Sequence, residues 1–296
     1  MRSKVRRKAA VAVALLLTLG AGPLLAGCGH LGTAWQRPTV VTSFYPLAFV
    51  AEQVAGGHED VVNLTHPGQE PHDLELSVAQ TADIVDADVV LYESGLQPAV
   101  DTAVVQDRHG PAVDAAVAGG PLRPGDPHFW LDPVRLARVT AAFTREMAAV
   151  DPAHGQDYRR RGRVLEQRLH RLDAAYRHGL ATCASRTIVV SHDAFSYLGR
   201  RYDLHVVAIN GLSPDAEPSP AHLRQLHDLI RSDHITTVFS EELASPVLAD
   251  TLAHDLGIRT AVLDPIEGLS AASAHQDYFS LMRRNLAAIQ EANHCE

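Results

Sequence analysis

Short β-rich runs alternate with amphipathic segments from residue 39 onward, and this alternation constrains the fold more than any other feature of the chain. Such a pattern is typical of βα units that build parallel sheets. In the first half we expect strands at 39–43, 60–65, 88–92 and 112–117, with helices at 47–55, 77–86 and 133–150. In the second half we expect strands at 187–191, 205–209, 236–240 and 259–263, with helices at 220–231, 246–255 and 276–292.

The segment 151–182 interrupts this alternation. Arg, Glu, Gln, Leu and Ala dominate it, and no β-branched run breaks it. The pattern predicts one long helix, on the order of 45 Å at 1.5 Å per residue. The expected fold is therefore α/β, with an N-terminal lobe (39–150) and a C-terminal lobe (183–296), each with a parallel-type sheet, joined by a rigid linking helix.

The N-terminus reads as an export signal. Five basic residues precede an apolar run over 9–25 that ends at small residues and is short for a membrane span. The sequence Leu25-Ala26-Gly27-Cys28 resembles a bacterial lipobox, so we expect cleavage of a signal peptide (1–27) and lipidation of Cys28, with 28–38 as a tether. The alternative is an ordinary signal peptide with an unrelated cysteine. The lipobox predicts a protein anchored to the outer face of the cytoplasmic membrane.

The mature chain is acidic. Without the five basic residues of the signal, 21 basic residues remain against 35 acidic ones, a formal charge of −14. This balance argues against nucleic-acid binding and favours attraction of cations, although it also serves solubility. Two cysteines remain beyond Cys28, and we expect Cys183 and Cys295 to form a disulfide in an oxidising compartment.

Four reactive side chains come just after predicted strands or just before a helix. They are His72, His128, His192 and Asp264, two from each half of the chain. In open α/β sheets, ligands bind beyond the carboxyl ends of the strands. Three imidazoles and one carboxylate make a full tetrahedral set for Zn²⁺. The pattern therefore predicts a metal in the cleft between the lobes, coupled to their closure.

Two further acids have ambiguous roles. Glu70 and Glu241 could each accept the second N–H of a ligand imidazole, or replace Asp264 as the oxygen ligand. Spacing alone does not decide the ligand set, because the four candidates lie 56, 64 and 72 residues apart and form no local motif. Ten of the 17 histidines we interpret as solvated: His58, His109, His154, His170, His178, His222, His227, His234, His254 and His275.

Several longer segments carry a family resemblance. They are 42–47, 68–75, 87–90, 128–133, 191–198, 213–220, 238–241 and 263–265. Together they resemble the solute-binding proteins of zinc and manganese ABC importers, known as cluster A-I, over about residues 39–290. The resemblance implies two βα lobes joined by a rigid helix, a single metal ion held by His72, His128, His192 and Asp264, and a membrane permease and its ATPase as partners.

The residue at position 192 bears on the metal. Histidine there resembles the zinc-binding members of the family, whereas glutamate is typical of the manganese-binding ones. The segment between Ala118 and Asp126 lacks the histidine-rich loop of many zinc members, which argues against a second metal-gathering site there. The stretch 93–98 begins with Glu93, but it lacks the acidic residue and the Trp that family members often carry at this place.

The expected function is capture of Zn²⁺ and its delivery to a permease by a monomeric protein that is not an enzyme. Four protein ligands leave no coordination position for an activated water. Alternatives are a Mn²⁺-binding importer component, a metal-stabilised surface adhesin, and a zinc hydrolase with Asp264 or Glu241 as general base. The sequence contains no HExxH element that would favour the hydrolase.

Overall fold

The computed structural model describes residues 38–214 and 216–296. The predicted signal peptide, Cys28 and the tether up to residue 37 lie outside the described residues. Within the described part of the chain, no helix combines the length and apolar character that a membrane span needs.

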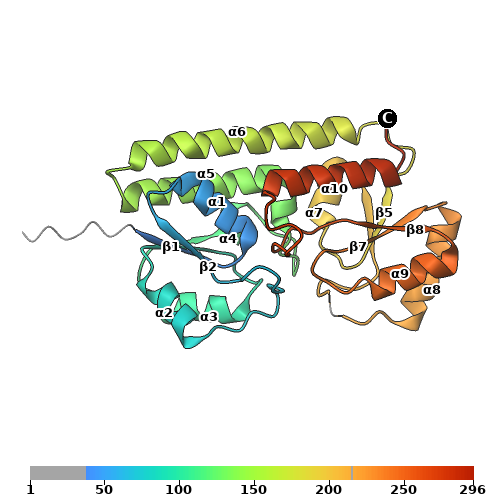
Figure 1. Ribbon diagram of the computed structural model, residues 1–296, viewed down its shortest axis with the longest axis horizontal. Helices are drawn as coiled ribbons and strands as arrows, with labels where there is room; N and C mark the ends of the chain where they lie inside the picture. The colour runs from blue at the N-terminus through green and yellow to red at the C-terminus, as the bar shows by residue number, and fades with distance from the viewer. Residues whose placement is uncertain (1–37, 215) are drawn as a thin grey trace, which may run out of the picture. The chain divides into compact units, whose positions relative to one another are not determined.

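The first half contains a parallel four-stranded sheet with the strand order β2-β1-β3-β4 (Figure 1). Alternate residues of one strand face opposite sides of the sheet: Val40 packs against α1, whereas Val41 faces the layer of α2 and α3. The strands are β1 (Thr39–Thr42), β2 (Asp60–Asn63), β3 (Val89–Tyr92) and β4 (Ala112–Asp114). The helices are α1 (Tyr45–Ala55), α2 (Val78–Asp86), α3 (Pro98–Gln106) and α4 (Ala115–Ala118).

The second half repeats this topology with the strand order β6-β5-β7-β8. Val189 faces a cluster with α8 and α9, and Val190 faces the core on the other side. The strands are β5 (Thr187–Val190), β6 (His205–Ala208), β7 (Thr237–Ser240) and β8 (Arg259–Val262). The helices are α7 (Ser196–Tyr202), α8 (Pro220–Ser232), α9 (Val247–Leu256) and α10 (Tyr278–Ala292). The two parallel-sheet lobes confirm the predicted fold class.

Two long helices connect the halves. A 3₁₀ turn, η1 (Phe129–Leu131), leads into α5 (Pro133–Val150), and α6 (Gly155–Gly179) follows after a short turn. The helix α6 is about 38 Å long at 1.5 Å per residue, and it runs alongside α5 and α10 (Figure 1). It is shorter than the predicted 151–182, because α5 ends at Val150 and Pro152 belongs to the turn before α6.

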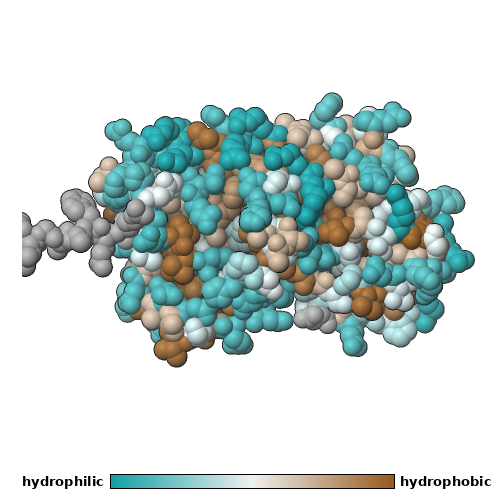
Figure 2. All heavy atoms as spheres, viewed as in Figure 1, coloured by the Kyte–Doolittle hydropathy of each residue, from teal (hydrophilic) through white to brown (hydrophobic). Residues whose placement is uncertain are grey.

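One large hydrophobic core runs through both halves. It includes Phe44 and Trp130 from the first half, Tyr176 of α6, and Phe195 and Tyr278 from the second. Hydrogen bonds reinforce this junction: Trp130 Nε1 donates to Pro265 O at 2.7 Å, and Tyr278 Oη donates to Trp130 O at 2.6 Å. The outer surface along α6 is largely hydrophilic (Figure 2).

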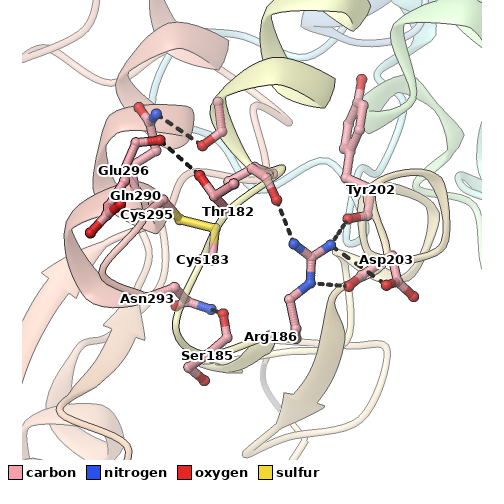
Figure 3. Close-up of a disulfide and its surroundings, with 12 residues drawn as sticks. Thr182, Cys183, Ser185, Arg186, Tyr202, Asp203, Gln290, Asn293, Cys295 and Glu296 are labelled. Atoms are coloured by element: carbon pink, nitrogen blue, oxygen red, sulfur yellow. Dashed lines mark hydrogen bonds and ion pairs between the residues drawn. A yellow bond between two sulfur atoms is a disulfide. The ribbon is translucent and has the colours of Figure 1, made fainter.

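The predicted disulfide is present. Cys183, after the end of α6, is bonded to Cys295, after the end of α10 (Figure 3). Hydrogen bonds flank the bridge, with Thr182 Oγ1 donating to Glu296 O at 2.9 Å and Asn293 Nδ2 donating to Ser185 O at 2.9 Å. The bridge therefore fixes the C-terminus to the segment between α6 and β5.

Candidate metal centre

Three histidines and one glutamate meet where the carboxyl ends of the two sheets face each other. His72 lies in the loop after β2, His128 directly precedes η1, His192 follows β5, and Glu267 follows β8. Their ligand atoms all lie within 4.8 Å of one another. Loops after parallel strands are where α/β folds place their ligands, and here two lobes each contribute two side chains.

The spacing of these atoms matches a tetrahedral zinc site. Glu267 Oε1 lies 3.1 Å from His128 Nε2 and 3.4 Å from both His72 Nε2 and His192 Nε2. The Nε2 atoms of His128 and His192 are 3.4 Å apart. Ligand bonds of about 2.0–2.1 Å at tetrahedral angles require ligand atoms to lie about 3.3 Å apart. Four of the six separations among the ligand atoms are therefore close to those of a zinc tetrahedron, and the other two are no longer than 4.8 Å.

The site is almost closed to solvent. His128 and His192 are fully buried, Glu267 is 2% exposed, and the His72 side chain is 15% exposed. Access to the ligand atoms thus lies on the His72 side. Burial strengthens electrostatic interactions with a bound cation, because little water remains to screen them.

Carboxylates orient the two buried imidazoles. Asp126 Oδ1 accepts a hydrogen bond from His128 Nδ1 at 2.9 Å, and Glu241 Oε1 accepts one from His192 Nδ1 at 2.7 Å. Since an ionised carboxylate can only accept, each Nδ1 carries the proton and each Nε2 faces the centre of the site. Ser196 Oγ of the second lobe donates to Asp126, so this orientation depends on both halves.

Charge is unevenly distributed among these groups. Burial alone would raise the pKa of Glu267, but hydrogen bonds from His128, His192 and His72 hold its pKa well below the ordinary range. Burial alone would lower the pKa of His192, but Glu241 and Glu267 raise it to about 10. The pKa of His128 is raised by Asp126 and Glu267 against the effect of burial. Without metal, Glu267 is therefore an anion that accepts hydrogen bonds from the neighbouring imidazoles.

The structure brings together three of the four side chains that the sequence singled out, and it leaves Asp264 out of the group. Asp264 Oδ1 accepts from Ile266 N at 2.8 Å, and Asp264 Oδ2 accepts from Arg284 Nη2 at 3.2 Å. One oxygen of Asp264 thus binds the turn that follows β8, and the other binds a side chain of α10. The carboxylate that reaches the histidines belongs to Glu267, three residues further along.

Glu241 and Glu70, the two acids with ambiguous roles in the sequence, contact different parts of the site. Glu241 contacts His192, whereas Glu70 Oε1 accepts from the backbone N–H of His72 at 3.1 Å and so supports the loop rather than the ring. Burial and the nearby charge of Glu267 raise the pKa of Glu70 to about 7. Sequence reasoning missed Asp126, although its position two residues before His128 was the available signal.

Comparison with known proteins shows the family to which this chain belongs. A family model described as "Zinc-uptake complex component A periplasmic" matches residues 40–292. The zinc-binding lipoprotein AdcA of Streptococcus pneumoniae is 33% identical over 94% of this chain and 60% of its own length. The high-affinity zinc uptake system protein ZnuA of Bacillus subtilis is 31% identical over 91% of this chain and 93% of its own. The chain thus spans three fifths of AdcA but nearly all of ZnuA.

Solved structures agree with the sequence comparisons. The Zn(II)-bound ZnuA-like domain of S. pneumoniae AdcA has a TM-score of 0.76 and 34% identity, covering 87% of this chain and 99% of that one. The laminin-binding protein Lmb of Streptococcus agalactiae, described as having adhesin and metal-transporting activity, has a TM-score of 0.78 and 29% identity, covering 86% and 99%. The chain belongs to the family of periplasmic component A proteins of zinc-uptake complexes.

Proposed function

We propose that this protein captures Zn²⁺ outside the cytoplasm and delivers it to the membrane permease of an ABC importer, with His72, His128, His192 and Glu267 as the ligands. The observation that carries the proposal is that Glu267 Oε1 lies 3.1 to 3.4 Å from the Nε2 atoms of all three histidines, a separation close to that between two ligands of a tetrahedral zinc ion. The names of its relatives, a zinc-binding lipoprotein and a zinc uptake protein, support the same metal.

The donor atoms favour zinc over manganese. Three imidazole nitrogens and one carboxylate oxygen suit Zn²⁺, whereas Mn²⁺ prefers a larger number of oxygen ligands. Four protein ligands also complete a tetrahedral coordination sphere, which leaves no position at which a zinc-bound water could be activated. We therefore propose binding without catalysis, with transfer of the metal itself as the function.

We further propose that the mature protein begins at Cys28 and is held at the membrane by a lipid on that residue. The basic and apolar segment before Leu25-Ala26-Gly27-Cys28 supports this. All four ligands come from one chain, which supports a monomer as the metal-binding unit. The partners on this proposal are the permease and the ATPase of the importer.

The direct test is a calorimetric titration of metal-stripped protein with Zn²⁺ and with Mn²⁺. We expect one tight zinc equivalent in the cleft and much weaker binding of manganese. His192→Ala should lower the zinc affinity of this equivalent by at least about tenfold. His170→Ala, which changes an exposed histidine of α6, is the matched control and should leave it unchanged. Tighter binding of manganese, or equal zinc affinity in both variants, would contradict the proposal.

Delivery requires a second experiment in cells. A bacterium that lacks its own zinc-binding component and carries the cognate permease and ATPase should regain growth in zinc-depleted medium when it expresses this protein. Glu267→Gln should fail to restore growth while the protein accumulates normally. If this variant restored growth, then growth would not depend on zinc capture at the proposed site, and the proposal would be wrong.

A further inference from the structure

The helix α6 is basic, although the chain as a whole is acidic. It contains seven arginines against three acids, whereas the whole chain has 26 basic residues against 35 acidic ones. Five of the seven arginines are exposed, while Asp157, Glu166 and Asp173 are half-buried or buried. The charge that α6 presents to solvent is therefore mainly positive.

The arginines are densest in the first three turns of α6, where the end of α5 packs alongside. We call this group the arginine patch: Arg145, Arg159, Arg160, Arg161 and Arg163. Arg160 is paired with Asp157. The other four members form no hydrogen bond or ion pair with any residue that the structure describes. Most of the donors in this patch are thus available to a partner.

Two shallow hollows with arginine walls flank the start of α6. One, of about 240 Å³, lies between α5 and α6 and is lined by three members of the patch, with Glu166 as the only acid among its described lining residues. The other, of about 290 Å³, is lined by Arg160, Arg161 and Arg168 and by no acid of the described chain. Guanidinium groups bind phosphate oxygens through paired N–H donors. The hollows therefore suit phosphate groups.

The described chain begins at the same end of the molecule as this patch (Figure 1). Pro38 O accepts a hydrogen bond from Asp60 N at 3.1 Å, which holds Pro38 next to the turn between α1 and β2. In that turn the ring of His58 stacks on the ring of His154, the residue before α6, with centroids 4.1 Å apart. A tether that leads to Pro38 therefore reaches the protein close to the first turn of α6.

We propose that the arginine patch binds the anionic phospholipid headgroups of the membrane that carries the protein, an inference that rests on the proposed lipid at Cys28. Residues 28–37 can span at most about 33–36 Å when fully extended, so the lipid keeps the patch near the bilayer surface. A polybasic patch strengthens attachment by a lipid, because two weak contacts of one chain reinforce each other. Such contacts are screened by salt and break readily, which leaves the protein free to meet the permease.

The test measures how close the start of α6 lies to the bilayer in reconstituted, lipidated protein. A dye is attached to Gln156→Cys, an exposed position in the first turn, while Cys183 and Cys295 are bonded to each other and do not react. Energy transfer from this dye to an acceptor on lipid headgroups is compared between vesicles of phosphatidylcholine alone and vesicles that also contain phosphatidylglycerol.

Transfer should be at least about twofold higher in the vesicles with phosphatidylglycerol, because anionic headgroups attract the arginines. The difference should vanish at about 0.5 M NaCl, where the charges are screened. The triple variant Arg159→Gln, Arg160→Gln, Arg163→Gln should show no increase with the anionic lipid. Equal transfer in the two kinds of vesicle with the unchanged patch would overturn the inference.

A second triple variant controls for the change in net charge. Arg224→Gln, Arg231→Gln, Arg283→Gln replaces three exposed arginines of α8 and α10 and should keep the full increase. Equal responses of the two triple variants would overturn the inference, since net charge alone would then decide. So would binding of soluble polyphosphate by the patch without a response to phosphatidylglycerol, because the partner would then be a polymer rather than a membrane.

Failure of the proposed function would be recognised separately. Mass spectrometry of the purified protein shows whether Cys28 carries a lipid, and calorimetry of the patch variant should give wild-type zinc affinity, because no residue of the patch belongs to the metal centre. A lipidated, zinc-binding protein that does not respond to anionic lipid would overturn this inference alone. An unmodified Cys28 would overturn both the proposed anchor and this inference.

Discussion

Among single side chains, Glu267 differs from the three histidines because it supplies the only negative charge at the centre of the site. One of its oxygens lies within 3.4 Å of all three Nε2 atoms. In the metal-free protein the imidazoles donate hydrogen bonds to this carboxylate, and these hydrogen bonds hold the pKa of Glu267 low. Zinc would replace those protons and keep the same carboxylate as a ligand.

Removal of this charge should weaken zinc binding more than any conservative change nearby. We expect Glu267→Gln to lower zinc affinity by at least about a hundredfold, because loss of a carboxylate that only orients a ligand already costs ten- to a hundredfold. Calorimetry of the metal-stripped variant measures this. Glu242→Gln is the control, because Glu242 pairs with Arg284 rather than with the histidines. Wild-type affinity in Glu267→Gln would exclude this residue as a ligand.

The protonation of His192 makes zinc binding depend on pH. Its pKa is raised to about 10, from an ordinary value near 6.5. The stability that its ion pairs contribute is therefore complete below about pH 6.5 and is lost as the pH rises through about 10. At about pH 8 the metal-free site still holds this proton, so zinc must displace it.

We therefore expect zinc binding at about pH 8 to release at least one proton, although a free histidine is mostly neutral there. Calorimetry in two buffers with different ionisation enthalpies gives the number released. Zinc affinity should also rise with pH across this range. Proton release near zero would mean that His192 is neutral in the metal-free protein and that the charge distribution described here is wrong.

Among the elements, the segment between β4 and α5 contains two aspartates with different tasks. Asp126 accepts from His128 Nδ1, whereas Asp132 caps α5 by accepting from Val134 N at 2.9 Å. We expect Asp126→Asn to lower zinc affinity about ten- to a hundredfold, because the imidazole loses its anionic partner. Asp132→Asn should cost some stability and leave zinc affinity unchanged. Equal effects of the two variants on zinc affinity would refute the orienting role of Asp126.

The disulfide connects elements far from the ligands. Cys183 and Cys295 close a loop of 112 residues, for which the chain-entropy model gives about 4 to 5 kcal/mol. Replacement of both cysteines by serine should lower the thermal midpoint clearly, as scanning calorimetry would detect. Zinc affinity should stay within about twofold, because neither cysteine contacts a site residue. A large loss of affinity would show that the bridge positions the cleft.

The elements also show what sequence patterns can and cannot predict. Every strand was predicted. The signal was plainest in runs such as Ile188-Val189-Val190, where β-branched residues are buried on both faces of the sheet. The short helices α3 and α7 were not predicted, since their apolar residues form no long periodic stretch. The strand expected at 112–117 ends at Asp114, whose side chain caps the short helix α4.

Glu267, the fourth residue of the site, could not be predicted from the sequence for a geometric reason. Asp264 follows its strand directly, as a ligand often does, but its oxygens bind Ile266 N and Arg284. Ile266 is fully buried and adopts a left-handed backbone with φ of 59°, which is rare for a β-branched residue. This turn brings Glu267 to the histidines, and no spacing rule specifies it.

At the scale of the whole molecule, the shared core bears on how the halves respond to zinc. Phe44, Trp130 and Tyr278 pack in one cluster, and Trp130 exchanges hydrogen bonds with the second half. We expect the metal-free protein to unfold in one calorimetric transition, with zinc raising its midpoint because only the folded state holds the site. Two separate transitions would show that the halves unfold independently and that the shared core does not couple them.

The central claim is that three imidazoles from distant parts of the chain and Glu267 surround one zinc ion. Anomalous diffraction at the zinc edge from crystals of zinc-loaded protein tests it most directly. The expected result is a single strong peak in the cleft, with the Nε2 atoms of His72, His128 and His192 and an oxygen of Glu267 each about 2.0–2.1 Å away. A peak bound by Asp264 in place of Glu267, or a zinc ion with a water as its fourth ligand, would contradict the account.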